Sequence, residues 1–276
     1  MPRRLLDRIV RRLTLPDDEN ERTQRLLDTE WLVTNGLGGY SSSTLAGVIT
    51  RRYHGILVAA LPNPFGRTVM LNHLGEQLKR GDRSTLLNSE RRVGGRLDPA
   101  IAKVVKSVRL DGGLPAWEYE WEGVHLEKRV YMPNRQNTVH VMYRVLDGSE
   151  DAVLMLHPAI HFRGYEDPVG SDDASPATSR YSIALSNGVQ VLSAEDHYPP
   201  LRLYFAGAHE HRFVANEQLT SEFLYPVEES RGYEFRGSLW RPGHFELELR
   251  SGSCVTLIAS VEREEVMLAL EPDEVA

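Results

Sequence analysis

The sequence has a single cysteine, Cys254, among 276 residues, which excludes a disulfide framework and any site built from several cysteine ligands. It also lacks an apolar run of the roughly 18–20 residues that a membrane-spanning helix needs, and it shows no signal-peptide core. Positive charge is not in excess, since the formal net charge is −7. We therefore expect a cytoplasmic protein that binds neither nucleic acid nor membrane.

Recognisable cofactor motifs are missing as well. The glycines of Asn35–Tyr40 resemble a nucleotide loop, but Ser41 stands where a dinucleotide motif needs its third glycine. A phosphate-binding loop of the Walker type needs a lysine directly after the glycines, and the first lysine of the chain is Lys79. The sequence therefore predicts no cofactor.

The histidines and carboxylates give no assignable metal or catalytic site. His157 and His161 are four residues apart, but Pro158 prevents the helix that would align them. His209 and His211 lack an identifiable third ligand. Carboxylates are abundant, yet catalysis by a carboxylate pair depends on a separation that spacing does not reveal. We name no metal ligand and no catalytic residue.

The first 29 residues predict an N-terminal extension. Apolar residues at helical spacing, with arginines between them, predict a short amphipathic helix over Met1–Leu15. The polar run Pro16–Glu21 then predicts a solvated linker. Residues 30–276 form the second part, in which Pro168–Ala177 predicts a surface loop because it has few apolar residues.

Period-two alternation dominates residues 30–276. Trp117, Tyr119 and Trp121 alternate with glutamates, as do Phe245, Leu247 and Leu249 with charged residues. Turn signals such as Asn187-Gly188 separate the segments. About a dozen short strands at this spacing predict an all-β fold, a large antiparallel β-sandwich. Further strands are expected at Gly55–Leu61, Ile101–Leu110, Leu126–Met132, Val139–Val145, Ala152–Ile160, Tyr181–Leu185, Val189–Ser193, Leu201–Ala206 and Cys254–Val261.

One short run concentrates hydrogen-bond donors and rings at the start of a strand. Arg51, Arg52, Tyr53 and His54 place two guanidiniums, a phenol and an imidazole in four residues. Donors suit vicinal hydroxyls, and an aromatic face suits the C–H face of a sugar. The same run is also typical of a strand start held by ion pairs, with His54 as a structural residue.

A longer pattern links this run to the glycines before it. Thr50–Gly55 follows Glu30–Ser42, and further matching segments come later in the chain. Together they resemble the N-terminal domain of bacterial and archaeal glycogen-debranching enzymes, the amylo-α-1,6-glucosidases. The resemblance covers about Glu30 to Leu249 and is densest in its first 30 positions. The later segments are Trp117-Glu118-Tyr119, Lys128–Met132, Asn137-Thr138-Val139, Glu228 with Arg231-Gly232-Tyr233, and Pro242-Gly243.

This resemblance implies a β-supersandwich of the galactose-mutarotase-like type, followed in such enzymes by an (α/α)6 barrel that carries the catalytic acid and base. The chain ends at Ala276, which leaves no residues for a barrel, so the resemblance implies the non-catalytic domain of such an enzyme. The expected partners are α-glucan, as glycogen or maltooligosaccharide, and the catalytic barrel. Self-association through an apolar docking patch is expected for the domain alone. The residues expected to line the glucan-facing edge are Trp31, Asn35, Arg51, Arg52, Tyr53 and His54.

Two other functions fit the same sequence. A free-standing sugar-binding or epimerase-like protein would need a histidine acid and a glutamate base, with His140 or His161 as candidates. A pure docking module would use the same scaffold without binding sugar. Fold alone does not choose between these functions.

Overall fold

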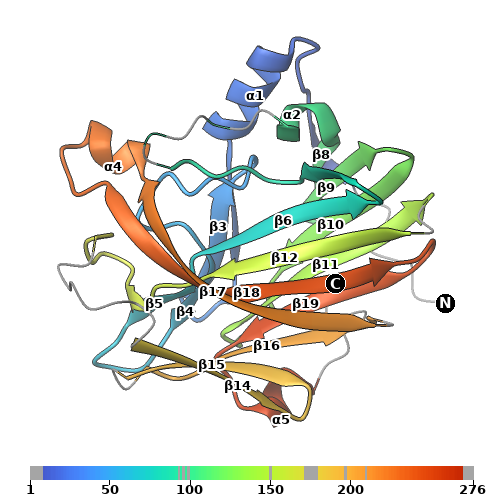
Figure 1. The fold of residues 1–276 in the computed structure, drawn as a ribbon. Helices are drawn as coiled ribbons and strands as arrows, with labels where there is room; N and C mark the ends of the chain where they lie inside the picture. Colours follow the sequence, from blue (N-terminus) through green and yellow to red (C-terminus); the bar gives the residue numbers. More distant parts are fainter. Residues whose placement is uncertain are drawn as a thin grey trace.

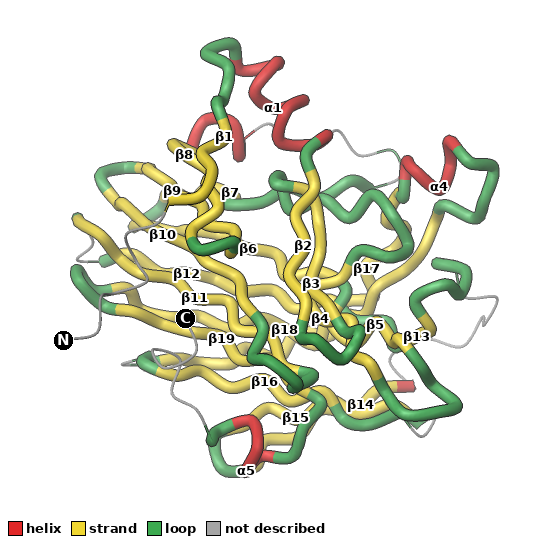
Figure 2. The backbone as a smooth tube through the Cα atoms, turned by 180° about the vertical axis from the view of Figure 1, so that it is seen from behind, coloured by secondary structure: helices red, strands yellow, loops and turns green. Residues whose placement is uncertain are grey.

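The computed structural model describes residues 9–92, 94, 97, 100–148, 151–170, 180–195, 198–208 and 210–269. Figures 1 and 2 show this part of the chain from opposite sides as layered sheets with short helices at their edges. The strands of all three sheets pair antiparallel. The predicted all-β fold of large antiparallel sheets is therefore confirmed.

The largest sheet has nine strands, and neighbouring strands in it are often distant in sequence. In spatial order they are β1 (Ile9–Leu13), β8 (Val105–Asp111), β9 (Leu114–Trp121), β10 (Val124–Tyr131), β11 (Thr138–Asp147), β19 (Cys254–Ser260), β16 (Leu201–Ala206), β15 (Val189–Ala194) and β14 (Tyr181–Ser186). β19, the last strand of the described chain, thus pairs near the centre of this sheet, between β11 and β16.

Two five-stranded sheets complete the fold. The β6–β18 sheet, which faces the viewer in Figure 1, contains β17 (His211–Leu224), β18 (Arg236–Leu249), β12 (Ala152–Ala159), β6 (His73–Arg80) and β7 (Arg83–Leu86). The β2–β5 sheet, which is nearer in Figure 2, contains β13 (Arg163–Gly164), β5 (Arg67–Leu71), β4 (Gly55–Ala60), β3 (Tyr40–Thr44) and β2 (Glu30–Thr34). The helices of the described residues are α1 (Glu19–Asp28), α2 (Ala100–Val104), α4 (Pro226–Ser230) and α5 (Glu264–Met267).

The inner faces of the nine-stranded sheet and the β6–β18 sheet form the core. Phe205 of β16 lies against Phe245 of β18 with ring centroids 4.8 Å apart. Tyr181 of β14 stacks on Trp240 of β18 at 5.1 Å. Aromatic pairs at these distances stabilise a core beyond the area they bury. They fix the two sheets as the layers of a sandwich.

A buried ion pair also joins the two layers. Glu76 of β6 has a fully buried side chain and accepts a hydrogen bond from Lys128 Nζ of β10 at 2.7 Å. The Tyr143 hydroxyl of β11 donates to the same carboxylate. The Lys128 ammonium also lies 5.1 Å from the centroid of the Trp117 ring. Because both charges are removed from water, each depends on the other for compensation.

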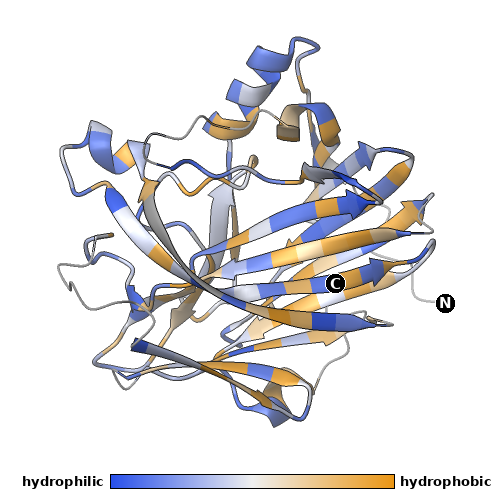
Figure 3. Ribbon diagram, in the orientation of Figure 1, coloured by the Kyte–Doolittle hydropathy of each residue, from blue (hydrophilic) through white to orange (hydrophobic). Residues whose placement is uncertain are grey.

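The alternation that predicts the strands follows their burial. In β12, Leu154 and Leu156 are buried while Val153 and Met155 are half-buried. Figure 3 shows the corresponding change of colour along the strands of the β6–β18 sheet. The predicted turn at Asn187-Gly188 joins β14 to β15, and both residues have positive φ, 51° and 79°. A two-residue turn with positive φ at both positions matches the right-handed twist of the strands that it joins.

The predicted helix over Met1–Leu15 is wrong where the structure describes it. Residues 9–13 form strand β1, which pairs with β8, and residues 1–8 lie outside the described residues. A helix of about three turns is only marginally stable by itself, whereas the edge of β8 provides a strand with which this segment pairs. The helix of the extension is α1 instead, which begins inside the predicted linker Pro16–Glu21 and continues to Asp28. The Asp18 carboxylate caps it by accepting hydrogen bonds from the amides of Asn20 and Glu21.

The predicted strand Ile101–Leu110 begins too early. Its first residues form α2, in which Ile101, Ala102 and Val104 are buried. The Arg22 side chain of α1 donates to the carbonyl of Ala102 at 3.3 Å, so the two helices support each other. A short apolar run such as this one is compatible with a strand or with a buried helix. Contact with α1 favours the helix here.

Two further expectations concern segments at the limits of the described chain. The loop predicted over Pro168–Ala177 lies mostly outside the described residues, which resume at residue 180. Among the described residues, no helix is both long enough and apolar enough to cross a membrane.

Candidate functional site

Asn35 holds the glycine-rich loop between β2 and β3. Its side chain is buried, and its Oδ1 accepts a hydrogen bond from the Leu37 amide at 2.9 Å. Its Nδ2 donates to the carbonyl of Gln136 at 2.9 Å and to Asn137 Oδ1 at 3.1 Å. The amide is therefore occupied by the protein itself, and Asn35 shapes the loop from beneath.

Gly39 allows the chain to approach Asn35 closely. A Cβ atom at this position would lie 2.6 Å from Asn35 Nδ2 and 3.0 Å from the carbonyl oxygen of Val58. Both distances are well inside van der Waals contact. The glycine is thus required by space, and it positions the next residue, Tyr40, at the start of β3.

Glu30 brings Arg51 and His54 together. The Thr50 amide donates to His54 Nδ1 at 3.1 Å, so the ring carries its proton on Nε2, which lies 3.5 Å from Glu30 Oε1. Arg51 Nε donates to the same oxygen at 2.6 Å. The hydrogen bond from His54 lowers the pKa of Glu30 to about 2; burial opposes this change, and Arg51 adds to it. The predicted run is therefore held at its strand entrance by one carboxylate.

The low pKa of Glu30 gives a stability test. Its folded-state pKa of about 2 lies below the ordinary 4.5, so its contribution is complete above about pH 4.5 and is lost as the pH falls toward 2. We expect Glu30→Gln to lower the free energy of unfolding at neutral pH by about 1 kcal/mol, because the group is partly exposed and screened. Denaturant unfolding of both proteins between pH 7 and pH 2 should show this difference shrinking. A constant difference, or titration of Glu30 at its ordinary pKa, would contradict the assignment.

Arg52 is fixed by a segment far away in sequence. Its backbone amide donates to Glu228 Oε1 of α4 at 3.0 Å, and the Glu228 side chain is fully buried. The Arg52 guanidinium lies 5.1 Å from the ring centroid of Tyr53 and 5.0 Å from that of Tyr233. It also donates to the Tyr53 hydroxyl at 3.0 Å. The carbonyl of Arg52 accepts a hydrogen bond from buried Arg163 at 2.5 Å.

More tyrosines and an arginine extend this arrangement. The rings of Tyr53 and Tyr165 are 5.6 Å apart, and the Arg67 guanidinium lies 5.4 Å from the Tyr165 ring. The Tyr40 hydroxyl donates to the carbonyl of Tyr53 at 2.7 Å. Tyr233 is 53% exposed and Arg67 is exposed, whereas the others are half-buried. We call this set the Tyr–Arg surface: Tyr40, Arg52, Tyr53, Arg67, Tyr165 and Tyr233.

The structure separates Trp31 from the other predicted residues. Arg51, Arg52, Tyr53 and His54 form one cluster, with Asn35 under the neighbouring loop. Adjacent residues of a strand point to opposite faces, so Trp31 of β2 points away from Glu30 and is buried. Its indole N–H donates to the carbonyl of Thr44 at 3.2 Å.

Four members of the Tyr–Arg surface were not predicted. Tyr40 and Tyr233 lie within the family-like segments, which was the available signal for them. Arg67 and Tyr165 lie outside those segments, and only the pairing of β5 with β13 brings them near.

The two histidines considered for acid–base chemistry have other surroundings. Burial lowers the pKa of His140 to about 4, and its Nδ1 lies 3.1 Å from the Tyr131 hydroxyl. The pKa of His161 also falls to about 4, through burial and the charges of Arg163 and Arg180. Within the described part of the chain, neither histidine forms an ion pair with a carboxylate, and no group of three or more His, Cys, Asp or Glu side chains is arranged to hold a metal ion.

Comparisons with known proteins point to one family. The family model described as "Glycogen debranching enzyme N terminal" matches residues 29–256. A search of curated proteins gave no significant match. Among solved structures, a polysaccharide lyase matches 87% of this chain at 12% sequence identity with a TM-score of 0.33. The match spans 34% of that lyase, about a third of its length.

Proposed function

The chain belongs to the glycogen debranching enzyme N-terminal family, and on this premise we propose that it is the non-catalytic N-terminal domain of a cytoplasmic amylo-α-1,6-glucosidase. In this proposal, the Tyr–Arg surface holds α-glucan, as glycogen or maltooligosaccharide. A catalytic (α/α)6 barrel is the partner that the domain supports. The observation that carries the glucan-binding role is the placement of the Arg52 guanidinium between the rings of Tyr53 and Tyr233.

The chemistry of this surface suits a neutral polyol. Tyrosine rings offer flat apolar faces for the C–H side of a glucosyl unit, and their hydroxyls hydrogen-bond at the rim. A guanidinium presents several N–H groups in one plane, which suits a pair of neighbouring hydroxyls. Because the Arg52 side chain already contacts the two rings and lies 3.9 Å from the Glu228 carboxylate, little side-chain entropy is lost when a ligand binds.

The docking role is supported by exposed apolar residues of the β2–β5 sheet and its glycine-rich loop. Leu32 of β2 is 59% exposed, and Leu37 of the glycine-rich loop is 44% exposed. Exposed leucines beside a polar binding surface suit contact with another domain. In this proposal they meet the barrel, and in its absence they favour self-association.

Titration of maltoheptaose into the chain tests the glucan-binding role. We expect saturable binding, weakened about tenfold by Tyr53→Ala and by Tyr233→Ala, because each removes an aromatic contact worth about 1–1.5 kcal/mol. Tyr233 is more than half exposed, so its replacement should leave the fold intact. Isothermal titration calorimetry gives the affinities directly.

The matched control is Leu185→Ala, which removes a side chain that is 67% exposed. Leu185 lies on β14, an edge strand of the nine-stranded sheet that contributes no residue to the Tyr–Arg surface. It should bind maltoheptaose as the unaltered chain does. No saturable binding, or equal affinity in all four proteins, would rule out glucan binding at this surface.

A further inference from the structure

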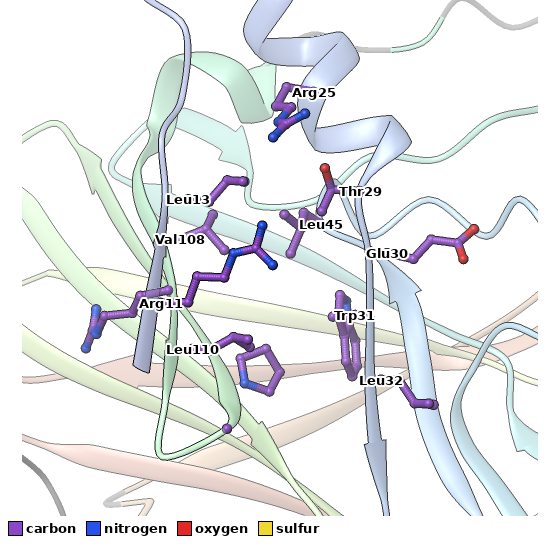
Figure 4. Close-up of a pocket in the computed structure, with 13 residues that line it drawn as sticks. Arg11, Leu13, Arg25, Thr29, Glu30, Trp31, Leu32, Leu45, Val108 and Leu110 are labelled. Carbon is purple, nitrogen blue, oxygen red and sulfur yellow. The ribbon is translucent and has the colours of Figure 1, made fainter. Parts of the chain in front are cut away.

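A cavity of about 260 Å³ lies between α1, β2 and the β1–β8 edge of the nine-stranded sheet. Figure 4 shows Trp31 on one side of it, Leu13, Val108 and Leu110 on the other, and Arg25 reaching in from α1. None of the residues of the Tyr–Arg surface lines this cavity. It is therefore a separate place on the domain.

One wall of the cavity is apolar and aromatic. The Trp31 N–H is already bonded to Thr44, and its ring meets Trp117 edge-on at 5.6 Å. What the indole can offer a ligand is thus its ring surface. Leu45 and Val108, both buried, continue the apolar wall. Such a wall suits the C–H face of a sugar ring.

The rim carries two arginines, Arg11 and Arg25. The register of β1 on β8 places Arg11 beside Leu110 and Leu13 beside Val108, so Arg11 shares the face that lines the cavity. Neither Arg11 nor Arg25 forms an ion pair with a carboxylate of the described residues. With respect to the described part of the chain, these two guanidiniums are therefore available to an anion.

The other charged groups at the cavity are already paired. The Glu30 carboxylate is occupied by Arg51 and His54. The Arg109 guanidinium contacts the carboxylates of Glu118 and Glu127. The carbonyl end of α1 also faces this region, but the amides of Leu45 and Ala46 bind the carbonyls of Thr29 and Leu26 and reduce its negative potential.

We propose that this cavity binds a phosphorylated monosaccharide. The phosphate would lie between Arg11 and Arg25, since guanidiniums bind phosphate through paired hydrogen bonds. The sugar ring would lie against Trp31 and the leucine and valine side chains beside it. The volume of about 260 Å³ lies near the lower end of small-molecule pockets, about 300 Å³, which suits a ligand as small as one phosphorylated hexose.

Calorimetric titration of the full chain with glucose 6-phosphate tests this proposal, with glucose and inorganic phosphate as separate ligands. We expect one-to-one binding of glucose 6-phosphate that is at least tenfold tighter than binding of either part. The double variant Arg11→Gln, Arg25→Gln should weaken it a further tenfold or more, because charged hydrogen bonds are lost. Both side chains are exposed, and a thermal unfolding curve confirms that the variant is folded.

Arg12→Gln is the matched control, since Arg12 lies on the same strand but faces the opposite side from Arg11. It should bind glucose 6-phosphate normally. Inorganic phosphate binding as tightly as the sugar phosphate, glucose binding as tightly, or full affinity in the double variant would each overturn the proposal. Maltoheptaose affinity should be the same in all these variants, so failure here is distinguishable from failure of the glucan-binding role.

Discussion

Lys128→Met is expected to lower the free energy of unfolding by about 3–5 kcal/mol, because it leaves the Glu76 carboxylate buried without its counter-charge. The Glu76 side chain has no exposed surface, and that of Lys128 is 8% exposed. The Tyr143 hydroxyl would remain as a donor to Glu76, but one neutral donor does not replace an ammonium. Denaturant unfolding at neutral pH measures the loss.

Two further variants make this test specific. Adding Glu76→Leu to Lys128→Met removes the orphaned charge and should recover a large part of the lost stability. Lys106→Met breaks an exposed pair with Glu120, whose side chains are 54% and 41% exposed, and should change stability little. Equal losses for Lys106→Met and Lys128→Met would show that burial of the ion pair is not the cause.

Gly39→Ala is expected to cost about 3 kcal/mol, since overpacking and the loss of a buried hydrogen bond act together. The new methyl group would lie 2.6 Å from Asn35 Nδ2 and 3.0 Å from the Val58 carbonyl, so the loop must move. Asn35 would then release the Gln136 carbonyl, and Tyr40 would shift. Both the unfolding midpoint and maltoheptaose affinity should fall.

Gly66→Ala is the control for Gly39→Ala. Gly66 has a positive φ of 62°, but a Cβ there meets nothing within 4 Å. Its replacement should cost about 1 kcal/mol from backbone strain alone, without loss of glucan affinity. If Gly39→Ala were no worse than Gly66→Ala, the close approach to Asn35 would not be what requires the glycine.

The strands that sequence predicts best are those whose two faces have different neighbours. β9 alternates from Trp117 to Glu120, and β18 from Gly243 to Leu249, because there one face meets the core and the other does not. The serine-rich strand β3 gives no such signal, since its buried residues include Ser41 and Ser43. β6 also lacks a clear alternation of apolar and polar residues, because its buried residues include the charged Glu76. Lys128 of the opposite sheet neutralises that charge.

Some residues of the candidate site can be predicted from consecutive positions in the sequence, whereas others come together only through the fold. Arg51–His54 could be predicted because its chemistry lies in consecutive residues. The contributions of Arg67, Tyr165 and Tyr233 depend on strand pairing and on α4, which adjacency in sequence does not reveal. Trp31 was grouped with its neighbours although the strand period places it on the opposite face from Glu30.

The hydrogen bond from the Arg52 amide to Glu228 joins positions 176 residues apart. Contacts of such long sequence separation form slowly, because the intervening chain must first be ordered. The Tyr–Arg surface therefore exists only when distant parts of the chain have come together. A ligand that binds there binds the folded chain and not the unfolded one. The ligand would therefore draw the folding equilibrium toward the native state by mass action.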